Sequence, residues 1–391
     1  MEVKQIATIL NTVTGELLGK SDIVTEDLSN IVDVGKELFT ATDVDNYVKS
    51  LVNQIGKIVF VSRPYRGGVP SVLMDAWEFG SVVQKISSDL PDATENESWE
   101  LQDKKSYDVN VFYKPKASSK FFNSRVTFEI PMSFTELQVK DSFQNATQLN
   151  AFISMLYNEV DKSMTVKIES LVMRTINNFI ATTLHHDFAS VEDGNYSGVT
   201  STRAVNLLKL YNDLKGTSLT ADKCMSDGDF IRYATYVIGL YIDRMQSMST
   251  LFNLGGKAKF TPKDMLHVIL LSDFANASKI FLQSNTFNND MVTLPNHDTV
   301  PYWQGSGDDY AFNKVSDIHV NIANGSGSTA EVNASGIIGV MFDRDALGVC
   351  NQNKRVTSNY NAKAEFFTNW FKCDSSYFND FNENFIVFFV A

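Results

Sequence analysis

One short stretch of the sequence, His185-His186-Asp187, brings together side chains that can bind a metal ion. Neighbouring residues of a helix point about 100° apart, so two adjacent histidines rarely bind the same ion. At the C-terminal end of a helix, cationic histidines instead offset the partial negative charge of the helix dipole. The sequence therefore favours a structural role here, as it does for the isolated histidines His267, His297 and His319.

Two carboxylate clusters are further candidates for chemistry, Asp308-Asp309 and the pair Asp343 and Asp345. Either could serve as a general acid/base pair or as a weak Ca²⁺ site, because carboxylate oxygens are the ligands that this ion prefers. We interpret both clusters as solvated loop acids.

The cysteines Cys224, Cys350 and Cys373 are odd in number and lack CxxC spacing, which is typical of buried free thiols in a reducing compartment. Cys350 has no sequence neighbours that would activate a thiolate. The motifs GxxxxGK[ST], GxGxxG, HExxH and GxSxG are absent, and the NGSGST turn at 324–329 lacks the lysine of a phosphate-binding loop. We therefore predict no catalytic, cofactor-binding or metal-binding residues, and we do not expect an enzyme.

Composition indicates a soluble globular protein with a large core. The chain has 391 residues, of which 43% are hydrophobic and 20% charged, enough for two or three domains. Its net charge of -12 disfavours sequence-specific binding to nucleic acid. The opening MEVKQIATIL does not have the pattern of a signal peptide, and no run of 18 apolar residues predicts a membrane span. We expect synthesis in a cytoplasm.

The element that must position everything else is a long helix between Asn145 and Asp187. Apolar residues recur there at helical spacing from Leu149 to Phe179, and no Gly or Pro interrupts them. A helix over 147–184 would be about 57 Å long, roughly three times the usual length. It lacks sustained heptads, so we predict a strut with one buried stripe, laid across a sheet.

The other elements alternate between helix and strand. A helix is predicted at 43–55 and a strand at 57–62. A two-stranded excursion follows, with alternating patterns at 107–113 and 122–130 around a turn at 114–120. Helices are then predicted at 203–214, 227–249 and 273–283, and strands at 268–271, 318–322, 336–342 and 384–390. The apolar final strand must be buried.

This order of elements resembles the Hong Kong 97 bacteriophage capsid fold, an α+β fold with an N-arm, an E-loop β-hairpin, a P-domain built on a long spine helix and a β-sheet, and an A-domain. Three stretches look like major capsid proteins of small short-tailed phages with protein-primed replication: YVKSLVNQIGKIVFV (47–61), MDAWEFGSVVQKISSDLP (74–91) and the long helix. The closing segment 346–380 looks like a capsid C-terminus.

The resemblance implies a division of the chain into six parts. They are the N-terminal arm and helix (1–56), a P-domain strand and connection (57–73), the E-loop (74–122), the P-domain with spine helix 147–184 (123–190), the A-domain (191–354) and C-terminal P-domain strands (355–391).

The resemblance also implies a function, that of a major capsid (head) protein. Copies would assemble with one another into pentamers and hexamers of an icosahedral shell that encloses phage dsDNA, in a virion made in the bacterial host. Scaffolding, portal and decoration proteins are the further partners implied, and no membrane or cofactor is. A relative of this fold cross-links its subunits through an E-loop lysine. We do not carry that role over, and we interpret the five lysines near the excursion as solvated charges: Lys104, Lys105, Lys114, Lys116 and Lys120.

Three alternatives stay open from the sequence. The first is an encapsulin-type bacterial compartment that encloses cargo enzymes, with the same fold. The second is a tail or portal protein, which would form rings. The third, from a different class, is a hydrolase that uses dispersed carboxylates such as Asp308, Asp309 and Asp343, which would require a single concave pocket.

Overall fold

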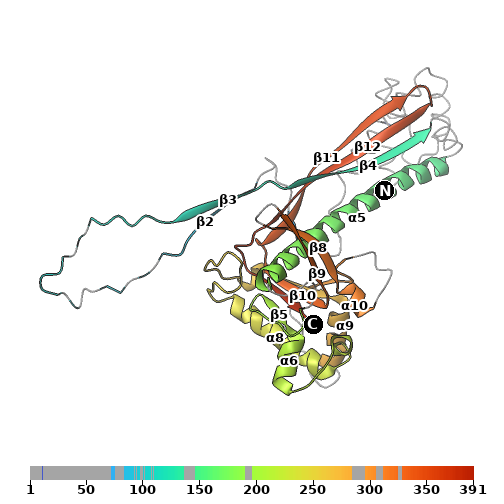
Figure 1. Cartoon of the computed structure of the whole chain (residues 1–391). Coiled ribbons are helices and arrows are strands. Elements are labelled where there is room, and N and C mark those ends of the chain that lie inside the picture. Colours follow the sequence, from blue (N-terminus) through green and yellow to red (C-terminus); the bar gives the residue numbers. More distant parts are fainter. Residues whose placement is uncertain are drawn as a thin grey trace. The chain divides into compact units, whose positions relative to one another are not determined.

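A computed structural model of the chain describes residue 11 and residues 72–74, 83–91, 93, 95–96, 100, 102–106, 108, 110–135, 146–189, 196–283, 296–304, 311–324 and 328–391. The helix predicted at 43–55 and the strand predicted at 57–62 lie outside these residues. The described residues form a mixed α+β fold (Figure 1) and divide into two compact units. The first takes its residues from 1–78, 125–172 and 349–376, and the second from 79–124, 173–348 and 377–391.

Four strands in the order β1-β11-β12-β4 form the sheet of the first unit. They are β1 (Leu73–Met74), β4 (Arg125–Thr135), β11 (Leu347–Asn361) and β12 (Phe366–Asn379). β1 runs parallel to β11, and β12 runs antiparallel to β4 from the pair Phe366–Thr135 to the pair Ser376–Arg125. Every second residue of β12 is buried between Phe367 and Cys373, which is the period of a strand with one covered face.

The long helix α5 (Ala146–Asp187) confirms the predicted helix within a few residues at each end. Up to Arg174 its described side chains follow the predicted single stripe, with Val160, Met164 and Ile168 buried and Glu159 and Lys162 exposed. The single stripe is wrong for the last turns, because residues 175–184 are buried on nearly every side. Asn177, in these last turns, is 5% exposed and donates from Nδ2 to the carbonyl of Trp303.

A five-stranded sheet in the order β5-β13-β10-β6-β7 forms the centre of the second unit. Its strands are β5 (Ala204–Asn206), β6 (Leu266–Leu271), β7 (Asp298–Val300), β10 (Ile337–Asp343) and β13 (Phe385–Phe389). The accompanying helices are α6 (Leu207–Lys215), α7 (Ala221–Cys224), α8 (Gly228–Met245), α9 (Ser272–Gln283) and α10 (Phe312–Val315), with a 3-10 turn at Lys263–Met265. Side chains of α6, α8 and α9 share one apolar cluster with those of β6, β10 and β13.

Local sequence signals explain where these helices begin. Asp227 accepts a hydrogen bond from the N–H of Phe230 and so caps α8, and Asn206 accepts one from Lys209 and caps α6. The predicted helix at 203–214 is therefore wrong in its first residues, since Ala204–Asn206 pair with β13 as strand β5. Among the helices of the described part, none has both the length and the hydropathy to cross a membrane.

The strand β13 is buried along its whole length, as its sequence FIVFF predicts. It lies between β5, to which it is parallel, and β10, to which it is antiparallel. The sequence analysis placed 355–391 among the C-terminal P-domain strands, whereas in the structure β13 pairs with strands from within 191–354. A strand that is apolar on both faces needs neighbours on both edges and cover on both faces, which this sheet provides.

Two antiparallel hairpins complete the second unit. β8 (Ile318–Asn324) pairs with β9 (Ser328–Ala334), a strand that the sequence analysis missed. β2 (Val83–Ser88) pairs with β3 (Ala117–Phe122), so the predicted turn at 114–120 is wrong after residue 116. The predicted strand at 107–113 is wrong for its described residues, because alternation forms a strand only where a partner is in register.

Candidate functional site

Asp187, for which the sequence analysis favoured a structural role over metal binding, belongs to a local hydrogen-bond network. Its carboxylate is 2% exposed and accepts from Nη2 of Arg203 at 2.6 Å, from Oγ of Ser201 at 2.5 Å, and from the imidazole of His186 at 3.2 Å. Burial raises the pKa of this carboxyl, but the hydrogen bonds from Arg203, Ser201 and His186 outweigh it, so the pKa lies below the ordinary value. The network ties the end of α5 to the start of β5. No group of three potential ligands occurs among the described residues.

Asp343 and Asp345 differ in their exposure to solvent. Asp343 is 5% exposed, and its carboxylate accepts from Oγ1 of Thr261 at 2.8 Å and from the backbone N–H of Asp345 at 2.9 Å. The interpretation as solvated loop acids is therefore wrong for Asp343, which fixes the turn between β10 and β11. Asp345 is exposed, as expected. Asp308 and Asp309 lie outside the described residues.

All three cysteines are buried thiols, as expected. Burial raises the pKa of Cys224 to about 12 and also raises that of Cys373. These thiols are therefore protonated at neutral pH and unsuited to nucleophilic chemistry.

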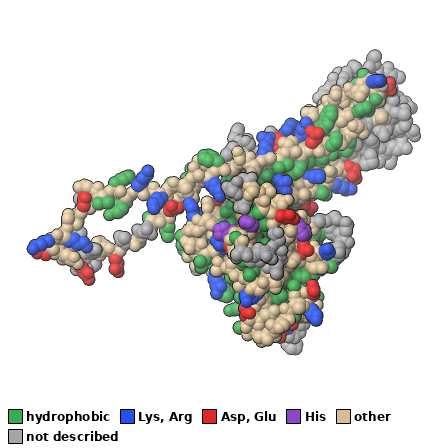
Figure 2. Space-filling view, in the orientation of Figure 1, with side chains coloured by type: hydrophobic (Ala, Val, Ile, Leu, Met, Phe, Trp, Pro, Cys, Tyr) green, Lys and Arg blue, Asp and Glu red, His purple; other side chains and the backbone are tan. Residues whose placement is uncertain are grey.

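The chain between β2 and β3 carries large apolar side chains exposed to solvent. In Figure 1 it runs as a long open loop, and Figure 2 shows hydrophobic side chains along it. Phe112 and Tyr113 are each 84% exposed. Leu90 and Val111 of the same stretch, and Ile86 of β2 and Phe121 of β3, have exposed fractions between 48% and 73%. Such a set has no core of its own within the described part of this chain, and contiguous exposed apolar groups mark interaction surfaces.

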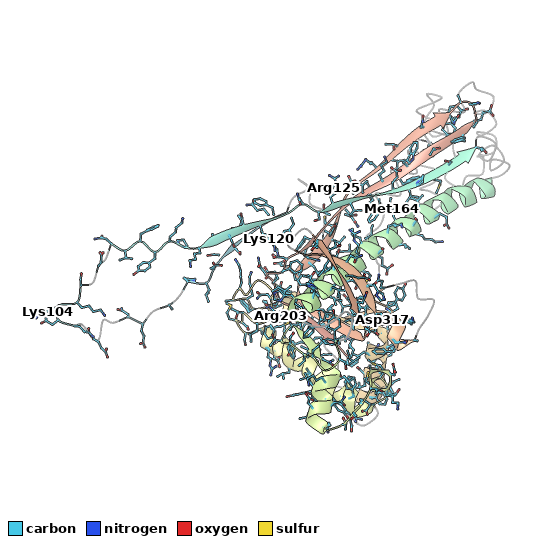
Figure 3. The ribbon with its side chains drawn as sticks, viewed as in Figure 1. Lys104, Lys120, Arg125, Met164, Arg203 and Asp317 are labelled. Carbon is cyan, nitrogen blue, oxygen red and sulfur yellow. The ribbon has the colours of Figure 1, made fainter. Side chains whose placement is uncertain are left out.

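Lys120 differs from the other loop lysines. Lys104, Lys105, Lys114 and Lys116 are exposed, as predicted. Lys120 lies at the base of the loop, far from Lys104 (Figure 3), and Nζ of Lys120 is 3.2 Å from Oδ1 of Asp380. The prediction of a solvated charge is therefore wrong for Lys120.

Asp380 binds two lysines, one from each strand of the hairpin. Its Oδ2 is 3.2 Å from Nζ of Lys85, and its side chain is only 4% exposed. Burial raises the pKa of Asp380, but the positive charges of Lys85 and Lys120 and a hydrogen bond from the N–H of Asn382 outweigh it, so the pKa falls below the ordinary value. Asp380 is thus an anion that holds two cations.

Sequence reasoning missed this cluster for a physical reason. Lys85 and Asp380 are 295 residues apart, and Lys120 and Asp380 are 260 apart. The only sequence signal is a single lysine in each arm of the hairpin. Their pairing depends on the register of β2 and β3, which the sequence patterns do not specify.

Comparison with known proteins now defines the class. The chain resembles the solved capsid structure of Staphylococcus phage Andhra, with a TM-score of 0.50 and 12% identity over 84% of this chain and 86% of that one. It also matches the capsid of cyanophage P-SCSP1u, with a TM-score of 0.44 and 11% identity over 85% and 90% of the two chains. No curated protein sequence matches. The fold is that of a Hong Kong 97-like phage capsid protein.

A family model identifies the protein more specifically than its fold does. The family model described as "Phi29-like phage major capsid protein" matches residues 6–389, and the chain belongs to this family. It is therefore a structural protein of the virion, a phage major capsid subunit that self-assembles into a shell. This finding removes the bacterial compartment and the tail or portal protein as alternatives.

Proposed function

We propose that the subunits close into pentamers and hexamers of an icosahedral shell around phage dsDNA, and that the loop within 74–122 is an E-loop that lies on a neighbouring subunit. The observation that carries this proposal is the exposure of Phe112 and Tyr113, 84% each, in a loop with no core of its own. Covering one such aromatic side chain contributes about 1.5–3 kcal/mol. Several loops per capsomer would then contribute substantially to association.

The proposal also assigns the segments of the chain to domains of the capsid fold and gives its partners and place of synthesis. Residues 1–56 form the N-terminal arm, 57–73 and 123–190 belong to the P-domain, and 191–354 together with β13 form the A-domain. The net charge of -12 suits an inner wall that does not trap densely packed DNA. The chain is made in the host cytoplasm, works with scaffolding, portal and decoration proteins, and catalyses no reaction.

Electron microscopy of the purified protein tests the proposal. The natural chain, concentrated after gel filtration, should give closed shells or sheets of five- and six-membered rings. The double variant Phe112→Ser/Tyr113→Ser should stay an unassembled, folded subunit at the same concentration, because its loop has lost the apolar contacts. Lys114→Ser, an exposed polar position of the same loop, is the matched control and should assemble. Normal shells from the double variant would refute the role of the loop.

A further inference from the structure

The two faces of the β2–β3 hairpin are inverted relative to an ordinary surface hairpin. Register places Lys85 opposite Lys120 and Ser87 opposite Ser118 on one face. The other face carries Ile86 and Phe121, which are 73% and 62% exposed. A hairpin usually buries its apolar face and exposes its charges. Here the charged face is turned toward its own subunit.

The charged face is held by specific polar contacts. Lysines placed directly opposite one another repel and destabilise a strand pair, but Asp380 binds one with each carboxylate oxygen, at 3.2 Å in both cases. Lys85 also lies 3.7 Å from Glu383 and donates to the carbonyl of Asp345. The two lysines, which would otherwise repel one another, thus both form ion pairs with the turn between β12 and β13.

Asp380 is itself rigidly placed. Its backbone N–H donates to the carbonyl of Ala346 at 2.6 Å, and Oδ1 accepts from the N–H of Asn382 at 3.2 Å. Aromatic rings flank the ammonium groups, since Lys85 lies 5.5 Å from the ring centre of Phe378 and Lys120 lies 5.8 Å from that of Phe381. The carboxylate is therefore a fixed point for the hairpin.

A second attachment lies two residues further along the same face. Nζ of Lys257 is 2.9 Å from Oγ of Ser118 and 3.2 Å from Oδ1 of Asp89. Two points of attachment fix both the position and the direction of a two-stranded ribbon, which a single contact would leave free to rotate. Short isolated hairpins are marginal in water, so the direction of this one depends on the attachments.

We propose that Asp380, with Lys85 and Lys120, is a positioning clamp that aims the loop and turns the Ile86–Phe121 face outward as a contact surface for a second copy of this chain. The inference rests on the proposed role of the loop in contacting a neighbour. It adds the residues that set the direction of the loop and a second apolar contact at its base. The contacts that the charged face makes within the subunit leave Ile86 and Phe121 on the other face available for contacts between subunits.

Amide hydrogen exchange of the unassembled subunit tests the clamp directly. Asp380→Asn keeps the shape of the side chain but removes its charge, and should speed exchange at 83–88 and 117–122 by about ten- to hundredfold, as expected for the loss of one or two charge-assisted hydrogen bonds. Lys120→Gln should do the same from the other side, and Asp380→Glu should restore protection in part. Asp345→Asn is the matched control, because Asp345 binds Lys85 through its backbone carbonyl. Unchanged exchange in Asp380→Asn would overturn the clamp.

Electron microscopy of the same variants separates this inference from the proposed function. Neither Asp380→Asn nor Ile86→Ser/Phe121→Ser should form shells. Amide exchange in the hairpin should be faster in Asp380→Asn and unchanged from the natural chain in Ile86→Ser/Phe121→Ser. If Asp380→Asn frees the hairpin but still builds shells, the positioning role is wrong while the loop contact stands. If Ile86→Ser/Phe121→Ser builds normal shells, the outward face is not a contact surface. If Phe112→Ser/Tyr113→Ser assembles, the loop contact itself fails.

Discussion

Asp374 shows how a single carboxylate can link several strands of a sheet. It lies on β12 with its side chain 1% exposed, and it binds Arg125 and Thr127 of β4 and Arg355 of β11. Burial raises its pKa, but the hydrogen bonds from Arg355, Thr127 and Arg125 outweigh it and lower the pKa to about 2. The carboxylate thus joins three of the four strands in the sheet of the first unit.

This lowered pKa predicts a pH dependence of stability. The unfolded chain takes up the proton near the ordinary value of 3.8, whereas the folded chain does so only near 2. The stabilisation is therefore complete above pH 3.8 and is lost as the pH falls from 3.8 to 2. At about 1.4 kcal/mol per pKa unit, it amounts to about 2 kcal/mol. Denaturant unfolding between pH 6 and pH 2 measures it, and Asp374→Asn should be less stable at pH 6 and flatter over this window. An equally steep profile in that variant would assign the effect to other groups.

At the level of elements, replacing either of two glycines by alanine should change the free energy of unfolding in opposite directions. In β10, a Cβ on Gly339 would lie 2.6 Å from Cδ2 of Leu270 and 2.8 Å from the carbonyl oxygen of Ile269. On α8, a Cβ on Gly239 would meet nothing within 4 Å. The first position needs glycine so that β10 and β6 can approach, and the second does not.

Gly339→Ala should lower the free energy of unfolding by about 1–3 kcal/mol through overpacking. Gly239→Ala should raise it by about 0.5–1 kcal/mol, because alanine loses less backbone entropy in a helix. Thermal unfolding of both variants beside the natural chain measures the difference. A stabilising Gly339→Ala would show that the strands can separate without cost.

The same elements show how far the sequence determines the fold. The helix α5 and the strand β13 could be predicted because each carries its signal locally, an unbroken helical period in one and FIVFF in the other. The hairpin strands could not, because 107–113 alternates without a partner while β3 begins in the polar run ASSKFF. The binding of Asp380 to Lys85 depends on the fold of the whole unit, and no local pattern specifies it.

For the whole molecule, charge sets the conditions of assembly. Each subunit carries a net charge of -12, so copies repel one another as they approach. Raising the salt concentration from 0.05 M to 0.5 M shortens the screening length from more than 10 Å to a few ångströms. Light scattering should therefore show assembly at lower protein concentration in high salt. Slower assembly in high salt would show that ion pairs between subunits outweigh the net repulsion.

The central place of β13 has a consequence for translation. Because residues 385–389 lie between β5 and β10, the five-stranded sheet has a gap until the ribosome has passed residue 389. Chains begin to fold from the N-terminus as they emerge. Here β5 and β10 can join one sheet only after β13, near the end of the sequence, has been synthesised. A nascent or prematurely terminated chain therefore lacks the completed unit that a shell requires. We therefore expect truncated translation products that lack β13 to be absent from assembled shells.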